Sequence, residues 1–220
     1  MAKLLGFHEP GAGTMARAQF APKPRKWPKQ ARSQATFDAI LDATARILEE
    51  RGYDDLTTNA VAERAGASIG TLYEYFPNRE TLVALLIERE AGRVLAALAA
   101  SMAPLHALEL ERAMRIWLEA MFAELESREP LVRVLLTDVP FVSQLPVATE
   151  FPAALVAIAA TGGREREGQI ALDGLGSAYF LLANMLRGAY LAMLLDPPPG
   201  VTRAAMLDDL TTLVIRMLRE

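Results

Sequence analysis

The stretch AERAGASIGTLYEYFPNRE, residues 62–80, contains a helix stop and a new helix start only two residues apart. Gly66 is suited to end a helix, because glycine readily adopts the left-handed conformation that follows a last turn. Ser68 is suited to begin the next helix, because its hydroxyl can accept a hydrogen bond from the first turn. The spacing predicts a short helix over about 68–74. A core helix does not usually stop and restart so quickly, so the outer face of this helix is a candidate for binding another molecule.

The neighbouring sequence predicts three further helices around this one. Thr57 or Thr58 can cap a short helix that ends at Ala65. Before it, apolar residues at helical spacing predict a helix over 33–51. After it, Asn78 can cap a long helix that follows Pro77. Two short helices joined by a tight turn with glycine are typical of a helix-turn-helix.

The rest of the chain also has a helical pattern. Breaks are expected at Pro130, Pro140, Pro146, Thr161-Gly162-Gly163 and the DPPPG of 196–200. The helices expected between them lie at about 105–127, 129–138, 147–160, 168–195 and 202–219. No stretch alternates with period two for long enough to predict a strand. The predicted fold class is all-α, with three parts: a basic, disordered arm (1–30), a three-helix unit with the helix-turn-helix (31–80) and a larger helical body (81–220).

Composition and charge narrow the functional classes. The chain of 220 residues is 52% hydrophobic and has no Cys, which excludes disulfides and thiolate chemistry. Leu4–Phe7 is too short for a signal peptide, and Asp173 and Arg187 interrupt the most apolar stretch, so we expect a cytoplasmic protein with no membrane partner. The net charge is −4, but residues 1–33 hold seven Lys or Arg and one acidic residue. A basic arm on an acidic body is typical of phosphate contact, and a solubilising tail is the alternative.

A helix-turn-helix places the first residues of its second helix at base edges in the major groove. Gly70 is unfavourable inside a helix but lets the backbone approach another surface closely. The hydroxyls of Tyr73 and Tyr75 can reach phosphates. The same pattern also occurs in helical proteins that bind no DNA, and we expect Leu72 and Phe76 to be core residues.

The longer stretch LTTNAVAERAGASIGTLYEYFPNRETLVALL, residues 56–86, resembles the N-terminal domain of TetR-family transcriptional regulators. It matches the family pattern of a Thr before the second helix, I/V-A-x-x-A-G-V/A-S, G-T-L-Y-x-Y-F and N/S-K-E-x-L, and the resemblance covers about 34–90. The family usually has Lys where this chain has Arg79, which keeps a cation but changes the contact geometry. Asn59 and Ile69 occupy positions that vary in the family, so the operator sequence cannot be carried over.

The resemblance implies a set of DNA contacts. Phosphate contacts are expected from Thr57, Thr58, Tyr73, Tyr75 and Arg79. Base contacts are expected from Asn59, Ser68, Ile69, Gly70 and Thr71. The basic arm, with Lys23, Arg25, Lys26 and Lys29, is expected along the DNA backbone or in the minor groove.

The resemblance also implies a homodimer formed by the last two long helices. A stripe of mostly small residues fits close packing, and the expected interface residues are Gly174, Ala178, Leu181, Met185, Gly188, Ala192, Leu210 and Val214. The alternative is an ordinary core within one chain. A two-fold symmetric dimer would match a palindromic operator with half-sites about one DNA turn apart.

A small apolar effector is the second expected partner in the body. The candidate pocket residues are Met114, Trp117, Met121, Phe122, Phe141, Phe180, Asn184 and Arg187. Polar residues on this stripe can instead pair across the dimer, and the aromatic and Met residues can be plain core. Arg187 or Arg115 is a candidate partner for a weakly acidic group on the effector.

These observations predict a ligand-controlled repressor bound to double-stranded DNA, although the sequence equally allows an activator. The main alternatives are an enzyme and a helical interaction protein without DNA binding. The chain lacks the H-E-x-x-H, G-x-G-x-x-G and P-loop motifs, and with two His and no Cys we expect no catalytic site, metal or cofactor.

Overall fold

The computed structural model describes residues 22–102, 105, 107–164 and 175–219, without the side chains of 156, 159–164, 175–180, 182, 183, 218 and 219. The described residues form helices and connecting turns, with no strand among them, so the predicted all-α class is confirmed. The helices are α1 (Ala31–Arg51), α2 (Thr58–Arg64), α3 (Ile69–Tyr75), α4 (Arg79–Met102), α5 (Leu110–Glu126), α6 (Glu129–Thr137), the 3-10 turn η3 (Val142–Gln144), α7 (Val147–Arg164), α8 (Leu175–Leu195) and α9 (Arg203–Arg219).

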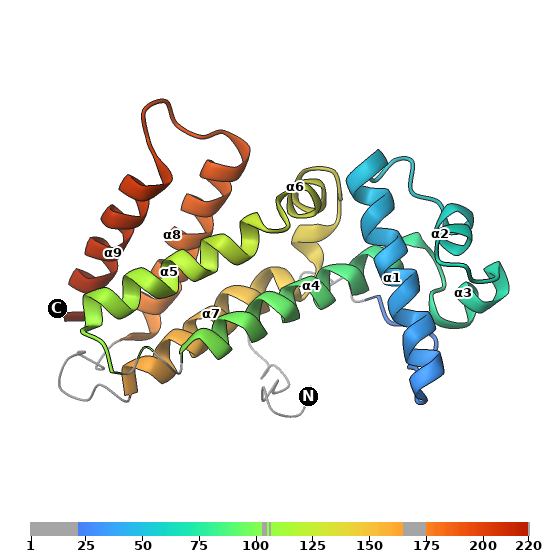
Figure 1. The fold of residues 1–220 in the computed structure, drawn as a ribbon, viewed down its shortest axis with the longest axis horizontal. Helices are drawn as coiled ribbons and strands as arrows, with labels where there is room; N and C mark the ends of the chain where they lie inside the picture. Colours follow the sequence, from blue (N-terminus) through green and yellow to red (C-terminus); the bar gives the residue numbers. More distant parts are fainter. Residues whose placement is uncertain (1–21, 103–104, 106, 165–174, 220) are drawn as a thin grey trace.

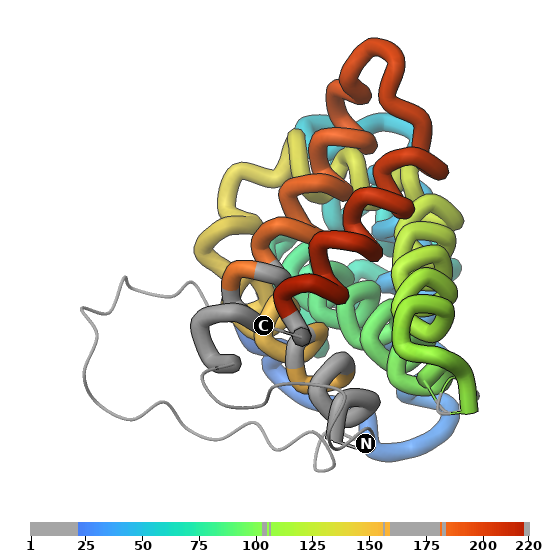
Figure 2. The backbone as a smooth tube through the Cα atoms, turned by 90° about the vertical axis from the view of Figure 1, so that its left-hand side faces the viewer, coloured from blue at the N-terminus to red at the C-terminus, as the bar shows by residue number. Residues whose placement is uncertain are grey.

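The molecule is elongated, with α1, α2 and α3 at one end and α8 and α9 at the other (Figure 1). The long helix α4 joins the two ends, because it packs against α1 near its start and against α5 and α7 further on. Figure 2 looks onto the body, where α9 lies between α8 and α5. Helix α4 therefore contacts both the N-terminal end and the body.

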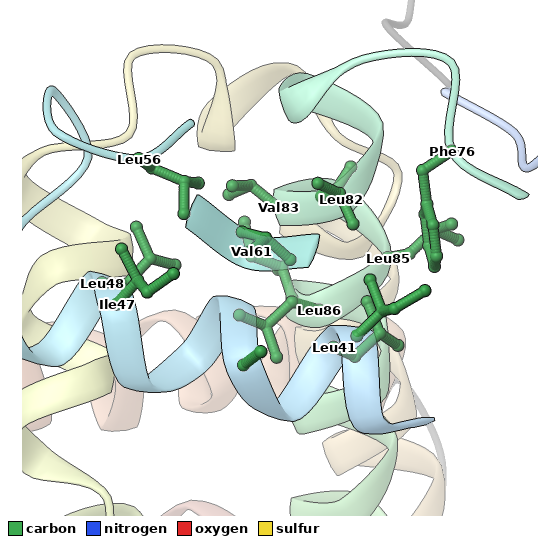
Figure 3. Packing of buried hydrophobic residues seen from close by; sticks show 14 of the residues in the cluster. Leu41, Ile47, Leu48, Leu56, Val61, Phe76, Leu82, Val83, Leu85 and Leu86 are labelled. Atoms are coloured by element: carbon green, nitrogen blue, oxygen red, sulfur yellow. The ribbon is translucent and has the colours of Figure 1, made fainter. Parts of the chain in front are cut away.

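The first hydrophobic core lies between α1, α2, α3 and the start of α4 (Figure 3). Val61 from α2, Phe76 after α3 and Leu86 from α4 converge on the buried face of α1. Residues 82–87 of α4 and apolar residues of α6 and the following loop complete this core. The domain boundary expected at residue 80 therefore falls within a single packed unit.

The second core lies in the body. It combines the far half of α4 with α5, α8 and α9 and with Leu155 of α7. Leu118 and Phe122 of α5 and Val214 of α9 are nearly inaccessible to solvent. The body thus has its own core, separate from the one that holds the two short helices.

Two predicted helix ends in the body were wrong. The run Thr161-Gly162-Gly163 does not break α7, which continues to Arg164. Helix α7 as a whole packs against α4 and α8, and such packing can offset the helical cost of two glycines, roughly 1 kcal/mol each. The helix expected from residue 105 begins at Leu110, after a turn in which the Leu108 N–H donates to the Leu105 carbonyl. The expected first turns of the helix over 168–195 fall outside the described residues as far as residue 174.

None of the helices in the described part of the chain has the length and apolar character of a membrane span.

Candidate nucleic-acid interface

The two short helices are fixed by side-chain caps and a tight turn. The Thr57 hydroxyl accepts a hydrogen bond from the Ala60 N–H (3.2 Å), and the Ser68 hydroxyl accepts one from the Thr71 N–H (3.0 Å). Between the helices, Gly66 has a φ of +65°, which side-chain-bearing residues rarely adopt. The predicted caps and glycine turn are therefore all present.

Helix α3 has one buried face and one open face. Leu72 and Phe76 are fully buried against α1 and α4, as predicted. On the opposite side, Gly70 is open to solvent, and Ile69 and Tyr73 are 39% and 38% exposed. Large apolar and aromatic side chains facing water on a short, rigid helix indicate a contact surface.

Hydroxyl groups connect the open sides of α2 and α3. The hydroxyl oxygens of Thr58 and Tyr73 lie 3.1 Å apart in a hydrogen bond. Asn59, the next residue of α2, is exposed beside them. The structure thus brings three of the predicted DNA-contact residues together on one surface.

The base-facing residues predicted at the start of α3 are only partly free to contact another molecule. The hydroxyls of Ser68 and Thr71 lie 2.9 Å apart in a hydrogen bond, and Thr71 is half-buried. Ile69 and Gly70 have no side-chain hydrogen-bonding group and are exposed. The backbone at Gly70 is the most open point of the helix start, since a methyl group added there would meet only the Ser68 hydroxyl, at 3.7 Å.

Arg79 holds the N-terminal domain together as well as facing outward. Its guanidinium lies 4.6 Å from the ring centre of Tyr53 and donates to the Leu56 carbonyl and to Glu80. Burial raises the pKa of Tyr53, against the opposite effect of Arg79. A guanidinium has five N–H donors, so Arg79 can hold the loop before α2 and still donate to a phosphate.

Tyr75 departs from its predicted role. It is only 4% exposed, and its ring meets Phe37 edge-on at 5.6 Å between centres. Aromatic residues at this spacing are a normal part of a core. We therefore assign Tyr75 to the core and not to the phosphate contacts.

Residues 22–30 lie against the end of α3, in contrast to the disordered arm that was expected. The Arg25 N–H donates to the Tyr75 carbonyl (2.8 Å), and Trp27 packs on Phe37 with ring centres 5.9 Å apart. Lys26 pairs with Glu74 of α3, at 3.3 Å between Nζ and Oε2. Lys29 is exposed. The basic side chain of Lys26 is therefore held next to the open face of α3.

A network of charged side chains lies where the two cores meet. Glu90 of α4 is buried and accepts from Arg93 (2.9 Å), from Arg89 (3.3 Å) and from Arg128 at the start of α6 (2.5 Å). Arg89 also reaches Asp42 of α1 (2.9 Å). The network ties the N-terminal domain to α4 and to the α5–α6 connection, and the sequence pattern gave no sign of it because its members are far apart along the chain.

The candidate effector site is more scattered than predicted. Trp117, Met121 and Phe122 lie in the body core, with Met114 packed at its edge. Phe141 lies in the other core, with its ring centre 6.0 Å from that of Tyr53, so its assignment to the pocket was wrong. Phe180 was also predicted to line the pocket, but its side chain is not among those that the structure describes.

The cations proposed for an acidic effector are engaged elsewhere. Arg187 is exposed and donates to Asn184 (3.2 Å) on the same outer surface of α8. Arg115 pairs with Glu119 (2.7 Å) and with Asp208 of α9. Neither guanidinium points into the body core, because each is held at its rim by a nearby acceptor.

Three buried polar atoms of the body have no hydrogen-bond partner among the described residues. One is Nε of Arg203, whose guanidinium pairs with Glu126 through another nitrogen. The other two are Nε1 of Trp117 and the hydroxyl of Tyr190, whose ring packs on Phe122 at 5.7 Å. Burial, together with Glu126 and Glu129, raises the pKa of Tyr190 to about 12. Buried donors usually have an acceptor, so both groups are candidates for holding one on a bound molecule. Sequence reasoning missed Tyr190, which lies in an apolar helix without any distinguishing motif.

The residues of the predicted dimer stripe are divided between the surface of the body and its core. On α8, Leu181 is 59% exposed, Gly188 and Ala192 are open, and Met185 is half-buried. On α9, Leu210 and Val214 are buried in the body core, so their assignment to the interface was wrong.

The large apolar residue on the outward side of α9 is Leu213, which is 47% exposed. Sequence spacing could not separate the two sides of α9, because apolar residues occur on both. Gly174 and the side chain of Ala178 lie outside the description.

These features define a class of protein: a helix-turn-helix domain with an open second helix, joined by one long helix to a separate helical body. Residues 40–86 match the family model of the bacterial regulatory proteins, tetR family. The match covers the two short helices and most of the residues that α1 and α4 contribute to the first core, and it does not reach the body.

Curated relatives match a part of the chain of similar length. The repressor KstR of Mycolicibacterium smegmatis is 46% identical over 55 residues, which is 25% of this chain and 27% of that protein. The chain thus aligns with about a quarter of the length of this relative.

Solved structures extend the likeness to the whole fold. A protein assigned to the TetR family from Mesorhizobium loti matches with a TM-score of 0.67 at 21% identity, over 86% of this chain and 97% of that one. The fatty acid degradation regulator FadR of Bacillus halodurans matches with a TM-score of 0.63 at 21% identity, over 83% and 100% of the two chains. At this identity the body shares a fold with these proteins and nothing finer.

Proposed function

We propose that this chain is a sequence-specific, DNA-binding transcriptional repressor that releases its operator when a small molecule binds in the body. The observation that carries the proposal is the open face of α3, where Ile69, Gly70 and Tyr73 are exposed on a helix whose other side is locked into the core. In a helix-turn-helix this face enters the major groove. TetR-family regulators are generally non-enzymatic, which agrees with a binding function.

The contacts divide into two kinds. Thr58 and Tyr73 hold phosphates in this proposal and fix the position of the helix, and their mutual hydrogen bond supports a shared role. Ile69 touches a base edge in this proposal, because an apolar side chain can recognise the methyl group of thymine. The polar residues set register, and the residues at the start of α3 set sequence.

A homodimer fits this function best. The helices α8 and α9, which carry the exposed residues Leu181 and Leu213, lie at the end of the molecule far from α3 (Figure 1). A two-fold axis there would present two reading helices to one side of a duplex. Such a dimer binds a palindrome whose half-sites are about one DNA turn, or roughly 34 Å, apart.

Release by an effector requires different affinities for the two states of the protein. The effector must bind the state that does not fit DNA more tightly, since equal binding shifts nothing. The unpartnered donors of Trp117 and Tyr190 favour an apolar molecule with a hydrogen-bond acceptor. Helix α4 and the Glu90 network connect this region to the N-terminal domain.

Selection of bound duplexes from a random DNA pool, at two salt concentrations, tests the proposal. We expect an enriched palindrome, with affinity that falls steeply as salt rises. The variant Tyr73→Phe, which loses only a hydroxyl, should bind the selected duplex more weakly and remain folded. Tyr190→Phe is the matched control, since it removes a hydroxyl in the body. No enrichment by the wild-type protein, with salt-sensitive binding to every sequence alike, would contradict the proposal.

A further inference from the structure

Glu74 is an acidic residue on the face of α3 that is proposed to meet DNA. It follows Gly70 by one helical turn, so the two residues lie on the same side of the helix. Both are exposed, whereas Leu72 and Tyr75 on either side of that face are buried. A carboxylate at this place lies close to the phosphates of a bound duplex and repels them.

The arm brings a cation to this carboxylate. Nζ of Lys26 lies 3.3 Å from Oε2 of Glu74, and the two side chains are 60% and 58% exposed. Lys26 also lies over the ring of Tyr75, at 5.6 Å from its centre. An exposed ion pair of this kind contributes little to folding stability, so a stabilising role does not account for it.

Other contacts hold the arm in place without this pair. The Arg25 N–H bonds to the Tyr75 carbonyl at the end of α3, and Trp27 packs on Phe37 of α1. Loss of the Glu74 carboxylate therefore leaves Lys26 next to α3. What changes is the net charge at this point of the DNA-facing surface.

We propose that Glu74 lowers the affinity of the reading helix for DNA, and that Lys26 of the N-terminal arm offsets this by pairing with it. The proposal rests on the proposed function and adds a residue that limits sequence-independent binding. When DNA binds, the Lys26 ammonium can leave the Glu74 carboxylate and pair with a phosphate. The carboxylate disfavours this change because it attracts Lys26 and repels the phosphate. The pair therefore sets how strongly the domain holds any duplex.

A double-mutant cycle tests this with four proteins: wild type, Glu74→Gln, Lys26→Gln and the double variant. Binding is measured on the duplex selected by the wild type and on an unrelated duplex, at about 50 and about 200 mM salt. Glu74→Gln should bind both duplexes more tightly. Raising the salt from the lower to the higher concentration should weaken its binding by a factor about three times larger, per subunit, than for the wild type. This is the effect expected of one added phosphate contact.

The results expected for the other variants follow from the same charges. Lys26→Gln should bind both duplexes more weakly and with less salt dependence, and the double variant should return close to the wild type. The control Glu119→Gln removes another exposed acid (48%, against 58% for Glu74) from an ion pair on α5, and should leave DNA binding unchanged. All five proteins should melt at the same temperature, because each altered pair lies at the surface.

Three results would overturn the inference. Unchanged binding by Glu74→Gln would mean that the carboxylate does not face DNA. Weaker binding by Glu74→Gln to the selected duplex alone would mean that Glu74 contacts a base. Absence of any duplex preferred by the wild-type protein would remove the proposed function, and this inference with it.

Discussion

The two cores of this chain differ in how completely they satisfy their own polar groups. In the N-terminal core, the buried hydroxyl of Thr44 donates to the Ile40 carbonyl, and that of Thr81 donates to Asn78. In the body core, Trp117 and Tyr190 have donors without partners in the described structure. The N-terminal core thus satisfies these polar groups within one chain, and the surface proposed to bind DNA lies outside that core. The body core has donors without partners among the described residues, and its helices carry exposed apolar residues, which fits binding of further partners.

The largest effect is expected from opening the N-terminal core. Phe76→Ala should lower the free energy of unfolding by about 3–5 kcal/mol, because the ring is fully buried and stacks on Phe37 at 4.7 Å between centres. Urea unfolding followed by fluorescence of Trp27, which also packs on Phe37, measures it. A loss below 1 kcal/mol would mean that this core is looser than its packing indicates.

The Glu90 network should be the next most sensitive point, since it joins the two cores. Glu90→Gln keeps the shape and removes the buried charge that faces three guanidiniums. We expect a loss of about 2–3 kcal/mol, less than for a fully buried pair because Arg93 and Arg128 are partly exposed.

The chain has two Trp residues, one beside each core, so the variants Trp27→Phe and Trp117→Phe report on the cores separately. Their urea transitions should coincide when Glu90 is intact. If the two Trp variants that keep Glu90 unfold at different urea concentrations, Glu90 does not connect the two cores.

A smaller effect is expected at the turn of the helix-turn-helix. Gly66→Ala has room for its methyl group but forces alanine into a positive φ, which costs about 1–2 kcal/mol. Thermal unfolding should show a lower melting temperature. Gly92→Ala, in the middle of α4 with nothing within 4 Å of the added methyl, is the control and should be neutral or stabilising.

The smallest effect should come from the body hydroxyl. Tyr190→Phe removes a group without a partner, so stability near neutral pH should stay constant or rise by up to about 1 kcal/mol. Since folding raises the pKa of Tyr190 to about 12, its contribution is complete below pH 10, the ordinary tyrosine pKa, and is lost as pH rises toward 12. The free energy of unfolding, measured as a function of pH, should therefore fall less between pH 10 and pH 12 in Tyr190→Phe than in the wild type. A large destabilisation at neutral pH would show that the hydroxyl has a partner.

The sequence predicted the N-terminal domain well because its signals are local. A cap, a glycine turn and a hydroxyl pair are fixed by residues a few positions apart, and Thr57, Gly66 and Ser68 lie where the pattern placed them. Tyr75 was misassigned because aromatic residues at helical spacing look alike whether they face the core or the solvent.

The body was harder to predict because its decisive contacts are long-range. Phe141 was placed in the wrong core, and Val214 on the wrong side of α9, since periodicity identifies an apolar face but not what covers it. Glu90 and Arg128, 38 positions apart, meet only in the folded chain.

The most direct test of DNA reading by α3 is the variant Gly70→Ala, measured for stability and for binding of the selected duplex in the same preparation. The added methyl group meets only the Ser68 hydroxyl at 3.7 Å, so the fold should gain up to about 1 kcal/mol. If α3 lies against DNA at this point, affinity should fall about tenfold or more, equal to about 1.4 kcal/mol. A stable variant that binds the duplex as tightly as the wild type would contradict the central claim.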